Sequence, residues 1–139
     1  MWISQSREIV KELKKNGYGA YWSNSPRAIF FSLRAKYFII DLFSSAFGFC
    51  YWFSGEGKKI NLWHGMPIKK IGYDDSKSII YNPNWLKRII FRIFIPWSVE
   101  KYDVLVLTSS LFQEIFIKSF RINKNNVIVA GHPRNDVFF

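Results

Sequence analysis

Short apolar runs alternate with segments of helical character along most of this 139-residue chain. Such alternation predicts a parallel β-sheet with helices on both faces, because parallel neighbours must be joined by a crossover segment. With 49% apolar residues, the chain can bury a core of its own. We therefore expect an α/β fold, a Rossmann-like parallel sheet in a single domain over residues 1–139. The expected strands are residues 19–22, 37–41, 59–63, 103–107 and 126–130.

Helix start and stop signals lie between these strands. Serine followed by proline is typical of a helix N-cap and first turn, and Asn-Gly is typical of a helix end. The expected helices are residues 4–15 (in an N-terminal helical segment 1–17), residues 26–35 after Ser25, and a helix from the cap Thr108-Ser109-Ser110 to about Phe120.

Side chains that can take part in chemistry follow several of the expected strands. His64, Thr108, Ser109 and His132 each stand at or just after a strand's carboxyl end. In parallel sheets these ends share one edge, where ligands bind. We therefore expect these residues on one rim of the sheet.

The segment around His64 combines a base with positive charge. An imidazole titrates near neutral pH and can take a proton from an attacking hydroxyl. Lys69 and Lys70 follow closely, and ammonium groups suit a phosphate-bearing partner. The segment thus predicts half of a phosphoryl-transfer site. Taken alone, these residues also fit a satisfied histidine at a strand end with two solvated lysines beside it.

The net charge of +10 implies an anionic partner, which is a nucleic acid, a phosphopolymer or an acidic membrane surface. The basic residues are dispersed, with neither an RRM-type aromatic motif nor a helix-turn-helix, so we expect no nucleic acid. Cys50 is the single cysteine, which excludes an internal disulfide and fits a buried apolar position. Asp41 and Asp103 fit strand-end residues, and Asp74-Asp75 fits a solvated loop, so no metal site is expected.

Residues 76–99 contain four cations and no acidic residue, and their prolines delimit a helix. On that helix Asn84, Arg88 and Arg92 form one narrow polar stripe. The broad apolar remainder is either a core helix packed under the sheet or a surface inserted among anionic lipid headgroups. In the second alternative, the membrane-contacting residues are Trp85, Lys87, Arg88, Arg92 and Trp97.

Three stretches of the chain resemble one known family. The run Trp63-His64-Gly65-Met66-Pro67-Ile68-Lys69-Lys70-Ile71-Gly72 resembles the signature of the CDP-glycerol glycerophosphotransferases, which make teichoic acids and related capsule polymers. Further along, Thr108-Ser109 and Phe116 resemble the family's strand-to-helix junction. Near the end, Gly131-His132-Pro133-Arg134-Asn135-Asp136 resembles its G-x-P-R-N-D motif. The three motifs occur in the family's order.

The resemblance implies the N-terminal, acceptor-side half of a GT-B glycosyltransferase-like fold. It implies transfer of glycerol phosphate, or a related polyol phosphate, from CDP-glycerol to a hydroxyl of a lipid-linked polymer. His64 takes the place of the family's essential histidine and would be the general base. Arg134 would bind phosphate or form an ion pair with Asp136. The substrate-binding residues implied are Gly65, Lys69, Lys70, Thr108, Ser109, Arg134, Asn135 and Asp136.

The same resemblance implies partners and a location. The family's donor-binding domain holds most of the CDP-glycerol site and is not recognised here, so we expect no cofactor on this half and no activity without a C-terminal half. The alternatives are a truncated gene product, a split gene whose second half is encoded separately, and an excerpted domain. The expected partners are a lipid-linked phosphopolymer acceptor and an anionic membrane. The expected location is cytoplasmic, peripheral on the inner face of the cell membrane. The alternative is a catalytically silent membrane-binding or interaction module.

Overall fold

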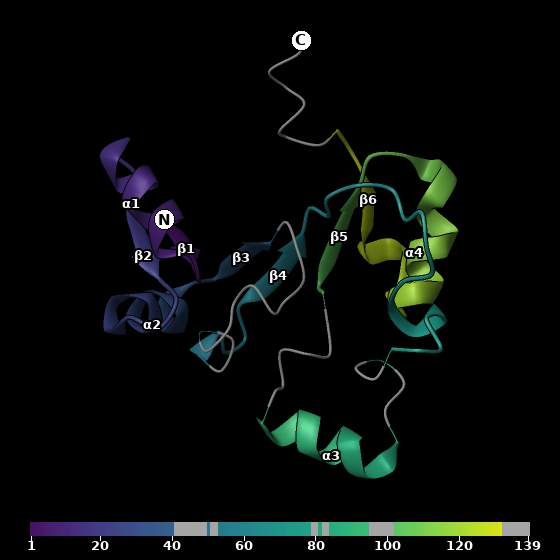
Figure 1. Ribbon diagram of the computed structural model, residues 1–139. Helices are drawn as coiled ribbons and strands as arrows, with labels where there is room; N and C mark the ends of the chain where they lie inside the picture. Colours follow the sequence, from purple (N-terminus) through teal and green to yellow (C-terminus); the bar gives the residue numbers. More distant parts are fainter. Residues whose placement is uncertain (41–49, 51–52, 79–80, 82–83, 95–101, 132–139) are drawn as a thin grey trace.

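The computed structural model describes residues 1–40, 50, 53–78, 81, 84–94 and 102–131, with only the backbone of Arg92 (Figure 1). Strands and helices alternate along most of the chain, as the sequence predicts. Short 3₁₀ turns cover Gly72–Asp74, Ser110–Phe112 and Lys124–Asn126. The longer elements are β1 (Trp2–Ser4), α1 (Arg7–Lys15), β2 (Ala20–Trp22), α2 (Pro26–Arg34), β3 (Tyr37–Ile40), β4 (Lys58–Asn61), α3 (Trp85–Phe94), β5 (Val104–Leu107), α4 (Gln113–Phe120) and β6 (Val127–Val129).

The strands form two parallel sheets. Strands β1 and β2 pair with each other, and β3, β4, β5 and β6 make a four-stranded sheet in chain order. Every strand pair is parallel. The α/β class with parallel pairing is thus confirmed, whereas the single sheet that we expected is divided into two.

The N-terminal segment differs from the helix expected over residues 1–17. Residues Trp2–Ser4 form strand β1, and α1 begins only at Arg7. The hydroxyl of Ser6 caps that helix by accepting the backbone N–H of Ile9 at 3.3 Å. Ser6 rather than Ser4 is therefore the N-cap, and Trp2–Ser4 can pair with β2.

The main core lies between one face of the four-stranded sheet and α4 (Figure 1). Its buried residues are Ile40, Trp63, Tyr102, Leu105, Leu107, Phe116, Phe120 and Val127. Strand β3 alternates between buried Phe38 and Ile40 and exposed Tyr37 and Ile39. A continuous apolar run such as that of β3 is typical of a strand buried on both faces, but Tyr37 is 66% and Ile39 69% exposed.

Cys50 occupies the buried apolar position that the sequence predicts. Its side chain is fully buried, and its thiol donates to the carbonyl oxygen of Ser23 at 2.7 Å. Burial raises the pKa of the Cys50 thiol, because the thiolate would lose its hydration. Cys50 therefore has a structural role, and its thiol contacts the N-terminal region at Ser23.

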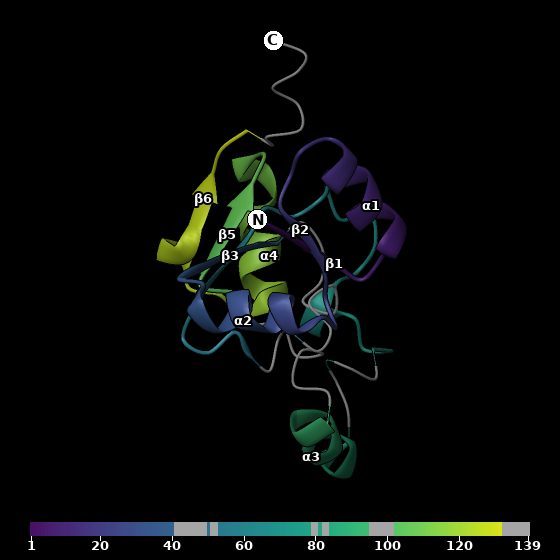
Figure 2. The ribbon, with the colours of Figure 1, turned by 90° about the vertical axis from the view of Figure 1, so that its left-hand side faces the viewer.

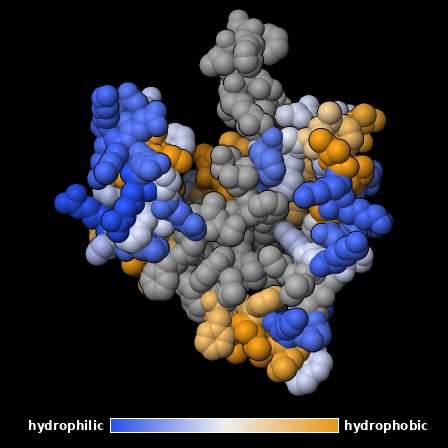
Figure 3. Space-filling view, viewed as in Figure 1, coloured by the Kyte–Doolittle hydropathy of each residue, from blue (hydrophilic) through white to orange (hydrophobic). Residues whose placement is uncertain are grey.

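Helix α3 stands apart from both sheets in two perpendicular views (Figure 1 and Figure 2). It follows Asn84, whose side-chain oxygen accepts the backbone N–H of Lys87 at 2.9 Å. The large apolar side chains of Trp85, Leu86, Ile89, Ile90, Ile93 and Phe94 are all exposed. Figure 3 shows the resulting apolar surface over α3. The alternative of a core helix packed under the sheet is therefore wrong.

No helix in the described part of the chain combines the length and the apolar character that a membrane span requires.

Candidate functional site

The site is built on the chain's exit from strand β4. The strand ends at Asn61, which is fully buried, and its side-chain oxygen accepts the backbone N–H of Trp63 at 2.6 Å. Trp63 has a left-handed backbone with φ of +55°. A bulky residue rarely adopts this conformation. The chain thereby turns sharply out of the strand just before His64.

His64 is exposed to solvent and lies against a buried ring. Its imidazole stacks on the indole of Trp63, with ring centres 4.7 Å apart and planes inclined by 28°. The indole is only 5% exposed and meets Phe116 and Phe120 of α4 at 5.2 and 5.1 Å. An exposed histidine nitrogen can exchange protons with a bound hydroxyl.

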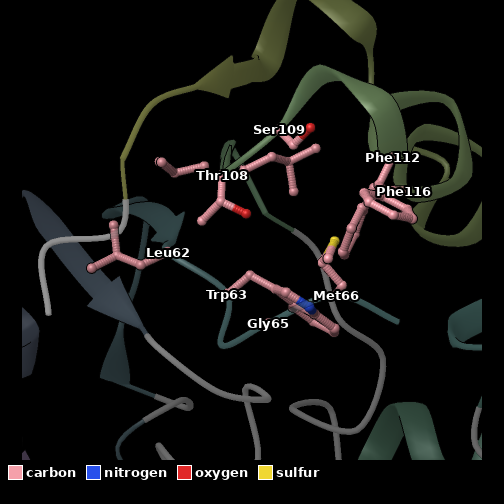
Figure 4. Close-up of a pocket in the computed structure, with 10 residues that line it drawn as sticks. Leu62, Trp63, Gly65, Met66, Thr108, Ser109, Phe112 and Phe116 are labelled. Atoms are coloured by element: carbon pink, nitrogen blue, oxygen red, sulfur yellow. The ribbon is translucent and has the colours of Figure 1, made fainter. Parts of the chain in front are cut away.

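A small pocket joins the loop after β4 to the loop after β5. Gly65 and Met66 line it from the first loop, and Thr108 and Ser109 from the second. Figure 4 shows these residues arranged around the space beside Trp63. The cavity volume of about 10 Å³ is close to that of one water molecule, far below that of a substrate pocket. The pocket itself therefore has no room for a substrate.

The two residues after β5 differ in what they contact. Thr108 is exposed, while the hydroxyl of Ser109 accepts the backbone N–H of Leu111 at 3.2 Å. Ser109 therefore caps the turn Ser110–Phe112 that leads into α4. A substrate contact from Ser109 would have to share its hydroxyl with this cap.

Lys69 and Lys70 are both exposed, and no ion pair of the described residues includes them. Exposed ammonium groups of this kind can bind an anion from solution.

The far end of the loop is fastened to the carboxyl end of α4. Gly72 is buried with φ of +56°, and a Cβ there would overlap the carbonyl oxygen of Ser119. Asp74 accepts the Ser119 hydroxyl at 2.8 Å and lies 3.7 Å from the Lys118 ammonium. The Arg121 guanidinium lies 3.9 Å from the centre of the Tyr73 ring. We call residues 62–75 the motif loop.

These contacts correct one prediction and reveal residues that sequence reasoning missed. Asp74 was expected in a solvated loop, but its carboxylate connects the motif loop to α4. Gly72 ends the quoted motif, and this glycine was the signal for a close backbone approach. Asp75 accepts the backbone N–H of Lys77 within a turn. In the portion of the chain that is described, no group of three metal-ligating side chains occurs.

Asp103 lies at the amino-terminal end of β5, away from the rim. Its carboxylate accepts the backbone N–H of Lys59 at 2.8 Å and lies 3.6 Å from the Lys58 ammonium. Burial lowers the pKa of the Lys59 ammonium, and the Asp103 charge opposes that change. Asp103 therefore joins β4 to β5, which fits the structural role expected for it.

Several predicted residues lie outside the described part of the chain. These are Asp41, Trp97, His132, Arg134, Asn135 and Asp136, together with the side chain of Arg92.

The fold defines a Rossmann-like α/β domain that presents a histidine just after strand β4, with two exposed lysines further along the same loop. A family model for CDP-glycerol:poly(glycerophosphate) glycerophosphotransferases matches residues 1–139. The chain belongs to this family, which confirms the resemblance of its motifs.

Two relatives are enzymes of teichoic acid synthesis. The chain is 29% identical over 77 residues to the teichoic acid glycerol-phosphate transferase of Staphylococcus aureus (strain NCTC 8325 / PS 47), covering 55% of this chain and 19% of that protein. It is 31% identical over 77 residues to the teichoic acid poly(glycerol phosphate) polymerase of Bacillus subtilis (strain 168), covering 55% and 10%.

The fold resembles part of a solved structure, that of the wall teichoic acid polymerase TagF. The TM-score is 0.64 at 17% identity, over 99% of this chain and 39% of that chain. This likeness confirms the predicted α/β fold class. The chain spans less than two fifths of each of these three proteins.

Proposed function

We propose that this chain is the acceptor-side portion of a CDP-glycerol glycerophosphotransferase. The complete enzyme would transfer glycerol phosphate, or a related polyol phosphate, to a hydroxyl of a lipid-linked teichoic acid or capsule polymer. Membership of the family supports this class of reaction. The observation that carries the proposal is the exposed His64 imidazole, which shares the motif loop with two exposed lysines.

The geometry suggests a division of roles in this reaction. The acceptor hydroxyl would attack the phosphorus distal to cytidine, and the bond from that phosphorus to the CMP oxygen would break. His64 would take the hydroxyl proton, and CMP would leave with the bonding electron pair. Lys69 and Lys70 would bind phosphates of the acceptor, and Gly65 and Thr108 would contact the acceptor at the rim.

The donor would be bound by a second half of the enzyme. Among the described residues, the rim pocket has room for about one water molecule. In this proposal the chain is inactive alone and requires a donor-binding half, encoded separately or as part of a longer protein.

A transfer assay with CDP-glycerol and a lipid-linked acceptor tests this function. The chain is assayed alone and with a family C-terminal half added in trans. We expect turnover only in the mixture, and a loss of about 10²–10⁴-fold in His64→Ala, the usual contribution of a general base. Lys11→Ala changes an exposed residue of α1 that has no part in the proposed site, and it serves as the control. Equal turnover of the His64→Ala mixture would contradict the role of His64.

A second proposal concerns the membrane, and the exposure of α3 supports it. We propose that α3 lies in the headgroup region of an anionic inner-leaflet surface, with its apolar side chains inserted and its cations at phosphate level. The apolar side chains are exposed, and Lys87 and Arg88 are exposed beside them. Arg92 and Trp97 stay predictions from the sequence, because their side chains lie outside the described residues. The protein would then be peripheral on the cytoplasmic face, close to its lipid-linked acceptor.

Vesicle sedimentation tests the membrane proposal. Each cation contributes about 1 kcal/mol on an anionic leaflet, so the double variant Lys87→Gln/Arg88→Gln should bind about 30-fold more weakly. The control Lys11→Gln/Lys15→Gln changes the charge equally on α1 and should bind nearly as wild type. Binding that is independent of anionic lipid would contradict the proposal. Binding without any turnover in the transfer assay would instead favour a silent membrane-binding module.

A further inference from the structure

The His64 imidazole stacks on the indole of Trp63. Trp63 is itself held by Phe116, Phe120 and Asn61. An exposed side chain on a loop ordinarily samples several rotamers. Here the imidazole lies against the Trp63 indole at 4.7 Å and 28°, a stacked arrangement. The stacking restricts the plane in which the imidazole nitrogens can present themselves to a ligand.

Trp63 is held in place from the core side by α4. Phe116 meets the indole edge-to-face at 5.2 Å and 82°, and Phe120 at 5.1 Å and 64°. Both phenylalanines are themselves buried, with exposed fractions of 2% and 6%. Edge-to-face contacts of this kind fix the tilt of a ring as well as its position.

The backbone of Trp63 is held by Asn61. The left-handed φ of +55° is unfavourable for a tryptophan, and such strain persists only where the surroundings impose it. The Asn61 side chain accepts the Trp63 N–H at 2.6 Å and is fully buried. The left-handed turn is therefore maintained by a buried hydrogen bond and not by the intrinsic preference of a tryptophan.

We propose that Trp63 and Asn61 are positioning residues for the His64 imidazole. Asn61 holds the turn, the turn places the indole on α4, and the indole provides the flat surface that orients the imidazole toward the rim. The proposal deepens the proposed function, because an oriented imidazole matters only if His64 is the base. When the imidazole is held in the plane from which it can take the proton, the enzyme avoids the loss of rate that even small misplacements of a catalytic group cause.

Proton NMR tests the positioning without any turnover. The chain has two histidines, so His64→Ala identifies the His64 signal and leaves that of His132. We expect the His64 ring protons to be shifted upfield by the indole ring current and to show NOE contacts with it. Trp63→Leu should abolish the shift, and Trp63→Phe should retain part of it. The control Trp2→Leu changes an exposed, distant tryptophan and should leave the shift unchanged.

The NOE measurement on wild-type protein needs no variant, so a variant that does not fold leaves the test intact. Absence of both the upfield shift and the NOE would overturn the proposal. A shift that survives in folded Trp63→Leu would also overturn it.

Kinetic measurements on the chain mixed with a donor-binding half then distinguish a positioning role of Trp63 from a role in packing alone. Trp63→Leu should lower kcat by up to about 10²-fold with little change in the acceptor KM, and Trp63→Phe should recover part of it. Unchanged kcat in Trp63→Leu would overturn the positioning role. If His64→Ala keeps full turnover, the proposed function fails, and the NMR result alone then decides whether Trp63 orients the imidazole.

Discussion

The motif loop and helix α3 are close in sequence and similar in composition, but the fold uses them in opposite ways. Both combine apolar residues with cations. The motif loop is fastened at both ends, where Trp63 is 5% exposed and Gly72 is buried against α4. On α3, Trp85 is 74% and Phe94 68% exposed. An apolar pattern therefore predicts local structure but does not identify what covers the apolar side chains.

The difference has consequences for function. A loop anchored at its two ends can expose Gly65, Lys69 and Lys70 in its middle without losing their positions. A helix whose apolar side chains remain exposed depends on another surface to cover them. Substitutions at the loop anchors should accordingly affect folding, whereas substitutions on α3 should affect binding.

The largest effect is expected at Gly72. Gly72→Ala would place a Cβ against the Ser119 carbonyl in a left-handed backbone. We expect a loss of about 2–5 kcal/mol in the free energy of unfolding, combining left-handed strain with overpacking. Urea denaturation measures this loss. The buried Cys50 thiol offers a second measurement, because its alkylation by iodoacetamide should accelerate about 30- to 4,000-fold as the unfolded population rises.

Gly17 provides the matched control. Its φ is +83°, but a Cβ there would meet no atom within 4 Å. Gly17→Ala should therefore cost only the left-handed strain, about 1–2 kcal/mol. Equal losses in the two variants would show that the contact between Gly72 and α4 contributes nothing.

A smaller effect is expected at Asp74, the polar part of the same anchor. Asp74→Ala would leave the buried Ser119 hydroxyl without its acceptor, and we expect a loss of about 1.5–3 kcal/mol. Lys118→Ala removes only a solvent-exposed ion pair and should cost less than about 1 kcal/mol. Urea denaturation of both variants compares them. A loss in Lys118→Ala as large as that in Asp74→Ala would assign the anchor to charge rather than to the hydrogen bond.

Most of the fold could be predicted from the sequence, because its signals are local. The Ser25-Pro26 pair marks the start of α2, and alternating apolar runs mark the parallel strands. Strand β1 was missed because three residues carry almost no periodicity, and Ser4 and Ser6 are equally good caps by composition. The division into two sheets depends on long-range pairing, which no local pattern records.

The candidate site could be predicted in part. Placing His64 and Ser109 at strand ends required only the order of strands. The roles of Asn61, Trp63 and Asp74 depend on contacts with residues of α4 or on a strained turn. The α4 partners of Trp63 and Asp74 are distant in sequence, and hydrogen bonding to a buried hydroxyl leaves no compositional signal.

The smallest effect on the free energy of unfolding is expected for a substitution on α3. This substitution tests whether the apolar side chains of α3 are left uncovered by the rest of the protein. Ile90 is 43% exposed, so Ile90→Gln should change the free energy of unfolding by no more than about 0.5 kcal/mol. The same substitution at Ile40, which is 4% exposed, should cost about 2–5 kcal/mol or more, because it removes core packing. Urea denaturation without lipid measures both. A loss above about 1 kcal/mol in Ile90→Gln would mean that α3 packs on protein in solution, since surface substitutions rarely reach that value. In that case the exposed apolar surface would no longer support insertion into a membrane.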